Sequence, residues 1–151
     1  MQSRRGAVVR QVGDGRGRAV GRGLESLDLP RPRLDSPTAV LVRILDVGVC
    51  GTDREICAFD YGTPPAGCEF LVIGHECLGE VVEVGPEATS VRPGDLVVPT
   101  VRRPCGRPEC LACAQGQQDF CSTGAFLERG IQRLHGFMTE RFVGAHGVWL
   151  D

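Results

Sequence analysis

Short apolar segments separated by turn residues run through most of the chain. They are rich in valine and have the length and composition of β-strands. The segments are residues 7–12, 39–50, 70–74, 78–85, 95–101, 137–143 and 147–150. Only residues 52–58 and 110–116 are candidates for helices, because twenty-one glycines and ten prolines leave little room for long ones. The pattern predicts a mainly β barrel or sandwich with short helices and decorated loops.

One turn between two of these segments is predicted in detail. The sequence Arg-Pro-Gly-Asp occupies residues 92–95, just before a valine-rich segment. Pro93 fixes φ at the first central position, and Gly94 supplies the positive φ of the second. We therefore expect a type II turn here.

A glycine-rich segment at residues 13–23 follows the first expected strand and has some likeness to a phosphate-binding loop. Counted from Gly13, the last position of the pattern G-x-G-x-x-G is occupied by Arg18. Residues 25–37 then contain three prolines where a helix would have to follow. A hairpin turn is the better interpretation, and no cofactor-binding residue is assigned.

The length of 151 residues suits a single domain, and its charge is unevenly distributed. Residues 1–33 carry eight arginines against three acidic residues, a net charge of +5, whereas the remainder carries nine against sixteen, a net charge of −7. A basic arm for nucleic acid is one interpretation of that beginning. No aromatic residue lies within it, so turns are favoured and no nucleic-acid partner is expected.

Cysteine usage and hydropathy indicate the compartment. Eight cysteines in 151 residues fall short of a secreted disulfide scaffold, and the first residues lack the apolar core of a signal peptide. No run approaches the roughly 18 apolar residues of a membrane span. We expect a cytoplasmic protein with reduced thiols, in which clustered cysteines hold metal.

Four cysteines occur close together in residues 102–122, here called the cysteine lobe. Cys105, Cys110, Cys113 and Cys121 have the spacing C-x4-C-x2-C-x7-C. Four thiolates can close a tetrahedral zinc site that leaves no position for substrate, which is typical of structural zinc. The alternatives are disulfides or a redox pair at the C-x2-C turn, which would need a thioredoxin-like setting that the sequence does not offer.

A second set of metal-type residues lies upstream. Cys50 and His75 each lie beside a glycine at the end of an expected strand, and Glu76 adds an oxygen next to the histidine. Three protein ligands with one open position describe a catalytic zinc site. The alternative is a buried cysteine and a hydrogen-bonded core histidine.

These motifs resemble the medium-chain, zinc-dependent alcohol dehydrogenase superfamily, and within it the glucose dehydrogenase branch. The resemblance is carried by GVCGTD at residues 48–53, GHE at 74–76, GDLVVPTVRRPC at 94–105, the cysteine lobe, and HGFMTE at 135–140. It covers nearly all of residues 40–143.

The resemblance implies that residues 1–151 form a GroES-like catalytic domain with one structural and one catalytic zinc ion. In the family this domain oxidises a sugar or alcohol hydroxyl by hydride transfer to NAD or NADP, which a following Rossmann domain binds. That domain has no counterpart in this chain, which stops at Asp151. We therefore expect the chain alone to be inactive. An alternative function is a zinc-binding or interaction module without redox activity.

The resemblance also assigns roles to single residues. Cys50 and His75 would bind the catalytic zinc, with Glu76 as a direct or water-mediated ligand. Asp53 would accept the second ring N–H of His75, although it could equally cap the helix that follows. The family's fourth ligand at this site has no counterpart here.

Two further residues would contact the substrate. By resemblance, Thr52 would hydrogen-bond the reacting hydroxyl and pass its proton outward, and Glu128 would bind other sugar hydroxyls. A plain surface glutamate is the alternative for Glu128. In the cysteine lobe, the first interval is x4 where the family usually has x2, which a flexible loop tolerates.

Three cysteines remain outside both sets. Cys57, Cys68 and Cys77 are expected to serve packing, because cysteine behaves as a small apolar residue. Cys68, in a glycine- and proline-containing loop, is the one expected to be exposed.

Overall fold

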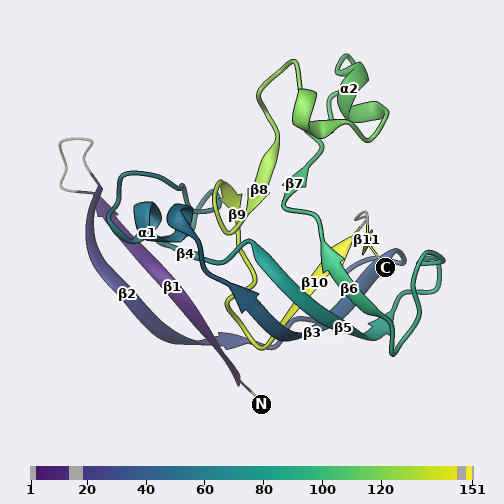
Figure 1. The fold of residues 1–151 in the computed structure, drawn as a ribbon, viewed down its shortest axis with the longest axis horizontal. Helices are drawn as coiled ribbons and strands as arrows, with labels where there is room; N and C mark the ends of the chain where they lie inside the picture. Colours follow the sequence, from purple (N-terminus) through teal and green to yellow (C-terminus); the bar gives the residue numbers. More distant parts are fainter. Residues whose placement is uncertain (1–2, 14–18, 146–148, 151) are drawn as a thin grey trace.

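Strands dominate the structure, a computed structural model that describes residues 3–13, 19–145 and 149–150 (Figure 1). The first sheet has the order β2-β1-β4, with β1 at Ser3–Gly13, β2 at Ala19–Pro30 and β4 at Phe70–Val72. The second has the order β10-β3-β5-β6-β11, at Arg141–Ala145, Ala39–Gly48, Glu76–Val84, Leu96–Pro99 and Trp149–Leu150. The third has the order β7-β8-β9, at Arg102–Arg103, Leu127–Arg129 and Arg133–Leu134.

Helices are few and short in the described part of the chain. They are α1 at Gly51–Cys57, α2 at Leu111–Ala114 and the 3-10 helix η1 at Gln118–Phe120. The mainly β class with short helices is thereby confirmed. Each of the three sheets is open among the described residues, so the expected barrel consists of sheets packed together rather than one closed ladder.

The glycine-rich segment connects two strands, as the hairpin interpretation predicted. β1 and β2 pair antiparallel along their length, and Gly13 is the partner of Ala19. Residues 14–18, the tip of this hairpin, lie outside the described residues. The strand β2 itself was not predicted, because its glycines and the nearby prolines favoured a turn.

The strand expected over residues 137–143 forms only in part, since β10 covers Arg141–Ala145. The preceding residues bond to a different sheet: the Ala7 N–H donates to the Met138 carbonyl at 2.8 Å. Two residues later, the Glu140 carbonyl accepts from a β3 N–H at 2.9 Å. The segment therefore crosses from the first sheet to the second and cannot belong to one ladder.

The other expected elements appear with small shifts, and three short strands were missed. β3, β4, β5 and β6 overlap their predicted segments, α1 is shifted by one residue from the predicted helix, and α2 covers only part of residues 110–116. The part of the last segment before Trp149 includes residues outside the described part of the chain. β7, β8 and β9 have two or three residues each, too few to show a period.

The predicted type II turn is present. Gly94 has φ of +95°, and the Asp95 N–H donates to the Arg92 carbonyl at 3.1 Å. A Cβ at Gly94 would meet no atom within 4 Å, so the backbone conformation alone favours glycine there.

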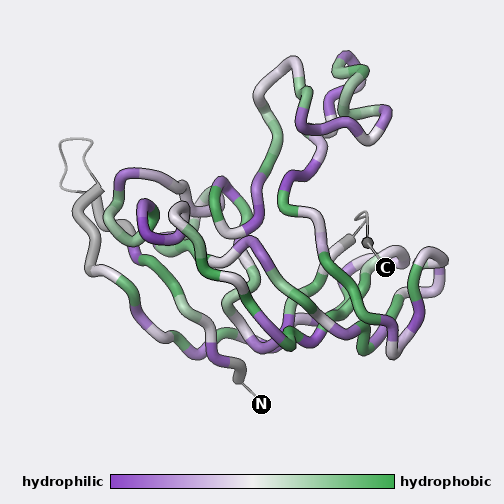
Figure 2. The backbone as a smooth tube through the Cα atoms, in the orientation of Figure 1, coloured by the Kyte–Doolittle hydropathy of each residue, from purple (hydrophilic) through white to green (hydrophobic). Residues whose placement is uncertain are grey.

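The core lies between the sheets and beneath α1. Hydrophobic and hydrophilic residues alternate along the strands of the body (Figure 2). One cluster of buried residues joins β3, β5, β6 and β10, and consists of Val40, Val42, Cys77, Val81, Val91, Val97, Phe137 and Phe142. A second cluster anchors α1 to β1 and β4, and consists of Val9, Ile56, Leu71, Ile73 and Ile131. This second cluster fixes the helix that carries part of the candidate site.

Among the residues that the structure describes, no helix has the length and apolar character needed to cross a membrane.

Candidate metal centres

The cysteine lobe projects from the sheet body at the ends of β7 and β8 (Figure 1). Its chain turns through α2 and η1, which contain few buried apolar residues. Leu111 and Phe120 are 72% and 77% exposed, so the lobe has no hydrophobic core of its own. A bound metal is the kind of crosslink that such a loop needs for a fixed shape.

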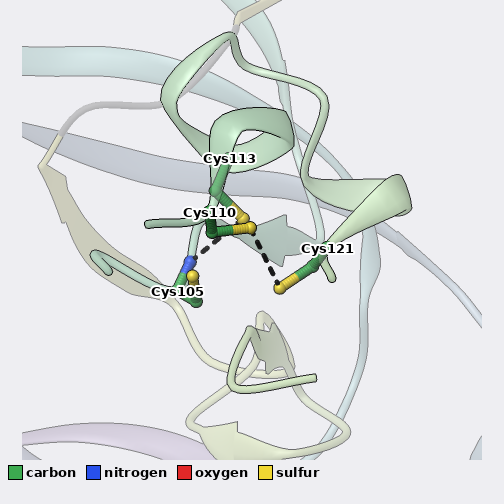
Figure 3. A group of neighbouring side chains, drawn as sticks. All are labelled: Cys105, Cys110, Cys113 and Cys121. Carbon is green, nitrogen blue, oxygen red and sulfur yellow. Dashed lines mark hydrogen bonds between the residues drawn. The ribbon is translucent and has the colours of Figure 1, made fainter. Parts of the chain in front are cut away.

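The four cysteine side chains of the lobe converge (Figure 3). Their sulfur atoms all lie within 4.8 Å of one another. Cys110 Sγ is 3.8 Å from Cys121 Sγ. Zn–S bonds of about 2.3 Å place neighbouring thiolates about 3.8 Å apart in a tetrahedron. The donor atoms and their spacing fit a closed structural zinc site.

Hydroxyl groups favour the thiolate form of two of these cysteines. The Ser122 hydroxyl donates to Cys110 Sγ at 3.5 Å, and this bond, followed by those from the backbone of Cys113 and Ser122, lowers the pKa of Cys110 to about 5. The hydroxyl of Thr123 lies 3.4 Å from Cys121 Sγ and lowers the pKa of Cys121 to about 7. Both sulfurs are therefore prepared to bind a cation near neutral pH.

The pKa of Cys113 is shifted in the opposite direction. The Cys105 N–H, 3.4 Å from Cys113 Sγ, acts to lower the pKa of Cys113. Burial and the neighbouring thiols outweigh that bond and leave the pKa raised to about 12. Crowded thiolates repel one another, and a divalent cation among them removes this obstacle to ionisation. All eight cysteines of the chain are free thiols in the structure.

The second candidate centre brings together residues from two parts of the chain. Cys50 ends the connection from β3, and His75 and Glu76 stand at the start of β5. The Cys50 sulfur, a His75 ring nitrogen and a Glu76 carboxylate oxygen lie within 4.8 Å of one another. Cys50 Sγ is 3.2 Å from His75 Nε2, which in turn is 3.7 Å from Glu76 Oε1. A thiolate, an imidazole and a carboxylate are all zinc ligands.

The start of α1 holds Cys50 in place. Cys50 is the N-cap residue, and its sulfur accepts from the Thr52 N–H at 3.4 Å. The Asp53 carboxylate accepts from the Cys50 N–H through Oδ2 at 3.0 Å, which completes a capping box. The helix therefore fixes the backbone of the sulfur donor.

Asp53 also faces His75. Its second oxygen, Oδ1, is 3.6 Å from His75 Nδ1, and the two side chains are 3% and 9% exposed. Both atoms are buried and neither has a hydrogen-bond partner. Buried polar atoms of this kind need an explanation. A small rotation of the ring would give an Nδ1–H bond to Asp53 and would leave Nε2 available for a metal ion.

Two glycine contacts make room for this centre. Gly48 is the register partner of Glu76 between β3 and β5, and a Cβ at Gly48 would overlap the Glu76 carboxylate. Gly74 packs so closely against Gly130 and Gly136 that a Cβ on either would overlap the Gly74 carbonyl. The residues on both sides of β9 are thereby packed against Gly74, the residue before His75.

The two residues predicted to contact substrate lie in different settings. Thr52 is partly buried in the first turn of α1, beside Cys50. Glu128 is 7% exposed, which rules out the plain surface glutamate. Arg102 Nη2 donates to Glu128 Oε1 at 2.7 Å, and this bond raises the pKa of Arg102. A ligand role for either residue stays a prediction.

Sequence reasoning missed the interactions of two arginines near this region. Arg102 pairs with Glu128, and Arg129 is 9% exposed with its guanidinium bonded to the carbonyls of His135 and Val143. Burial, and secondarily the charge of Arg103, lowers the pKa of Arg129 to about 10. No local signal distinguishes these residues from the other arginines, because partners such as Glu128 and Val143 lie on strands distant in the sequence.

The remaining cysteines behave as expected. Cys77 is buried in the main core, and desolvation raises its pKa to about 12. Cys57 is partly buried, and desolvation followed by the charge of Asp53 raises its pKa. Cys68 is exposed. Buried thiols with raised pKa values are unreactive, which agrees with a packing role for Cys77.

Comparison with known proteins gives consistent matches. Residues 36–149 match the family model described as alcohol dehydrogenase GroES-like domain. The glucose 1-dehydrogenase of Methanocella arvoryzae is 49% identical over 119 residues, which cover 79% of this chain and 33% of that protein. The glucose 1-dehydrogenase of Haloferax mediterranei is 45% identical over 116 residues, covering 77% and 32%. The chain thus spans about a third of the length of these relatives.

Solved structures agree with this pattern. Haloferax mediterranei glucose dehydrogenase in complex with NADP, Zn and gluconolactone has a TM-score of 0.79 and 36% identity. The match covers 97% of this chain and 39% of that one. Alcohol dehydrogenase TADH from Thermus sp. ATN1 has a TM-score of 0.69 and 26% identity, covering 93% and 37%.

Proposed function

Because the chain belongs to the alcohol dehydrogenase GroES-like domain family, we propose that it is the catalytic-domain portion of a zinc-dependent sugar dehydrogenase of the glucose type. In this proposal residues 1–151 bind the sugar and two zinc ions, and the electron acceptor is NAD or NADP. The relatives named above are glucose 1-dehydrogenases, and one solved structure holds NADP, Zn and gluconolactone. The chain's motifs and its relatives point to the same class of reaction.

The convergence of Cys50, His75 and Glu76 is the observation that carries the proposal. The three donor atoms come from two segments of the chain and lie within 4.8 Å of one another. The other ring nitrogen of His75, Nδ1, faces the buried carboxylate of Asp53. Structural zinc sites use four protein ligands, whereas three leave a position for substrate. The lobe offers four cysteine ligands, whereas the Cys50 centre offers three ligands and leaves one position open.

Bound zinc would act here as a Lewis acid that stabilises negative charge on a substrate hydroxyl oxygen. The protein's own residues would do the rest. Asp53 would hold His75 in the tautomer that leaves Nε2 as the donor. Thr52, next to the sulfur donor, would hydrogen-bond the reacting hydroxyl and accept its proton for transfer outward. Glu128 would orient the sugar by accepting a bond from another hydroxyl.

The alternative of a zinc-binding module without redox chemistry has no support in these comparisons. The relatives described above are dehydrogenases, and the family match at residues 36–149 extends across both metal centres.

A chimera tests the proposal. Residues 1–151 would be joined to the part of Methanocella arvoryzae glucose 1-dehydrogenase that follows its matching segment. We expect glucose-dependent reduction of NAD or NADP, abolished by Cys50→Ser and unaffected by Cys68→Ser, which changes an exposed thiol. A folded, zinc-loaded chimera that turns over none of glucose, galactose and xylose would contradict the proposal, and so would activity that survives Cys50→Ser.

A further inference from the structure

Arg102 and Glu128 face each other across the antiparallel pair β7–β8 as register partners. Two N–H groups of the guanidinium donate to the same carboxylate oxygen. Nε and Nη2 of Arg102 lie 3.1 and 2.7 Å from Glu128 Oε1. Within the described part of the chain, Oε2 accepts no hydrogen bond. That oxygen keeps its acceptor capacity for a ligand.

The surroundings make this arrangement more than a surface ion pair. The Glu128 side chain is 9% exposed, and a carboxylate so buried needs a cationic partner. Arg102 is 30% exposed and reaches the edge of the site. Together with Asp119 the pair lines a cavity of about 390 Å³ between β6 and the cysteine lobe. The cavity is large enough for a small polyhydroxylated ligand.

Arg102 is itself held on two sides. Its guanidinium lies 4.2 Å from the centre of the Phe126 ring. Its third donor, Nη1, is 3.4 Å from both the carboxylate oxygen Oδ1 and the backbone carbonyl of Asp119. These contacts are long and the Asp119 carboxylate is 76% exposed, so they are weak compared with the bonds to Glu128. Arg102 therefore makes weak contacts with Asp119 of the lobe and its strongest bonds with Glu128.

We propose that Arg102 is a positioning residue for sugar binding, which fixes Glu128 through Oε1 and presents Oε2 to one hydroxyl of a sugar in this cavity. The inference rests on the proposed function, because it takes Glu128 as a sugar-binding residue. Holding one oxygen in advance removes part of the ordering cost that a mobile carboxylate would add to binding. It also fixes the direction in which Oε2 accepts a hydrogen bond.

Monodeoxy sugars test whether Oε2 accepts a hydrogen bond from one particular sugar hydroxyl. Glucose and each of its monodeoxy analogues would be titrated into the zinc-loaded chain by NMR. We expect one analogue to bind about tenfold more weakly than glucose, because it lacks the hydroxyl that donates a hydrogen bond to Glu128. Glu128→Ala should abolish this discrimination. Arg102→Lys keeps the charge but loses the two-pronged contact, and should reduce the discrimination to about twofold.

The control is Arg107→Lys, which changes an exposed arginine of the same lobe whose nearest acid is Glu109. It should keep the full tenfold discrimination. A merely structural role for Arg102 would weaken the binding of all sugars equally and leave their ratio unchanged, which would overturn the proposal. Absence of discrimination in the unaltered chain would instead count against the sugar role of Glu128, and so against the proposed function.

A second measurement needs no sugar. In the zinc-loaded, 15N-labelled chain, the Arg102 Nε–H should exchange with water much more slowly than that of Arg107, and Glu128→Ala should remove the difference. Equal exchange rates for Arg102 and Arg107 in the unaltered chain would mean that Arg102 does not hold Glu128. The proposal would then fail whatever the sugar titrations show.

Discussion

Asp53 Oδ1 lies 3.6 Å from His75 Nδ1, and both atoms are buried without a hydrogen bond. Its other oxygen accepts from the Cys50 N–H at the start of the helix, so the Asp53 carboxylate faces both residues. The carboxylate connects the backbone of one candidate zinc ligand to the ring of another. Changes at this residue should affect the open metal centre without reaching the cysteine lobe.

Replacing Asp53 by asparagine should weaken metal binding at the Cys50 centre by about 10–100-fold, the usual effect of losing an outer partner of a ligating histidine. The amide oxygen of asparagine can still accept from the Cys50 N–H, so the capping box and the stability of the fold should be largely kept. Competition with a chelator would measure the affinity. Asp60→Asn, which changes an exposed carboxylate just after α1, is the matched control and should leave both centres unchanged. Equal affinities in the two variants would contradict the role of Asp53.

Gly48→Ala should also damage this centre. The new methyl group would overlap the end of the exposed Glu76 side chain, so the Glu76 carboxylate must move away from its present position. Metal affinity at the Cys50 centre should fall while that of the lobe persists. Gly51→Ala is the control, because a Cβ there would meet no atom within 4 Å. Thermal unfolding and metal titration of both variants would decide, and identical behaviour would argue against Glu76 as a ligand.

The sequence predicted the two candidate centres better than it predicted the strands that carry them. Ligand spacing is a local property, so the four lobe cysteines were identified from C-x4-C-x2-C-x7-C alone. Strand β2 was missed because glycines and prolines obscured the alternation that ends at Leu29. The burial of Glu128 and its ion pair with Arg102 could not be predicted, because they depend on the pairing of two strands too short to leave a signal.

Removing one thiolate should open the lobe. Cys113→Ser leaves three sulfur donors, and zinc affinity there should fall by more than the roughly 100-fold that an outer partner can contribute. A mild chelator should then remove the ion from the lobe. Cys68→Ser removes an exposed thiol elsewhere and should have no effect. If Cys113→Ser held its zinc as tightly as the unaltered chain, the four-cysteine assignment would be wrong.

The lobe should release its metal only in acid. In the metal-free lobe the bond from the Ser122 hydroxyl is the largest of several that lower the pKa of Cys110 to about 5, so the thiolate that binds zinc is present at neutral pH and is protonated only in acid. Ser122→Ala removes the donor and should move the release midpoint to higher pH, whereas Ser90→Ala, at an exposed position, should not. Acid titration of the cobalt-substituted chain would measure both midpoints. A midpoint unchanged by Ser122→Ala would contradict this account of the thiolate.

The Cys50 centre should lose its metal before the lobe does. Binding there needs a deprotonated cysteine and a neutral histidine, and the centre offers three donors rather than four. Two stages of release should appear in the same cobalt titration, and His75→Ala should remove the first stage only. Release of both ions in a single step would count against two independent centres.

The most direct test of two distinct zinc centres is the zinc content of the purified chain, measured by elemental analysis beside His75→Ala and Cys113→Ser. Two ions per chain are expected without substitution. His75→Ala should retain one ion that resists mild chelation, and Cys113→Ser, once its lobe is stripped by that chelator, should retain at most the ion of the Cys50 centre. A chain that binds no zinc, or one whose zinc content is the same in all three proteins, would contradict the account.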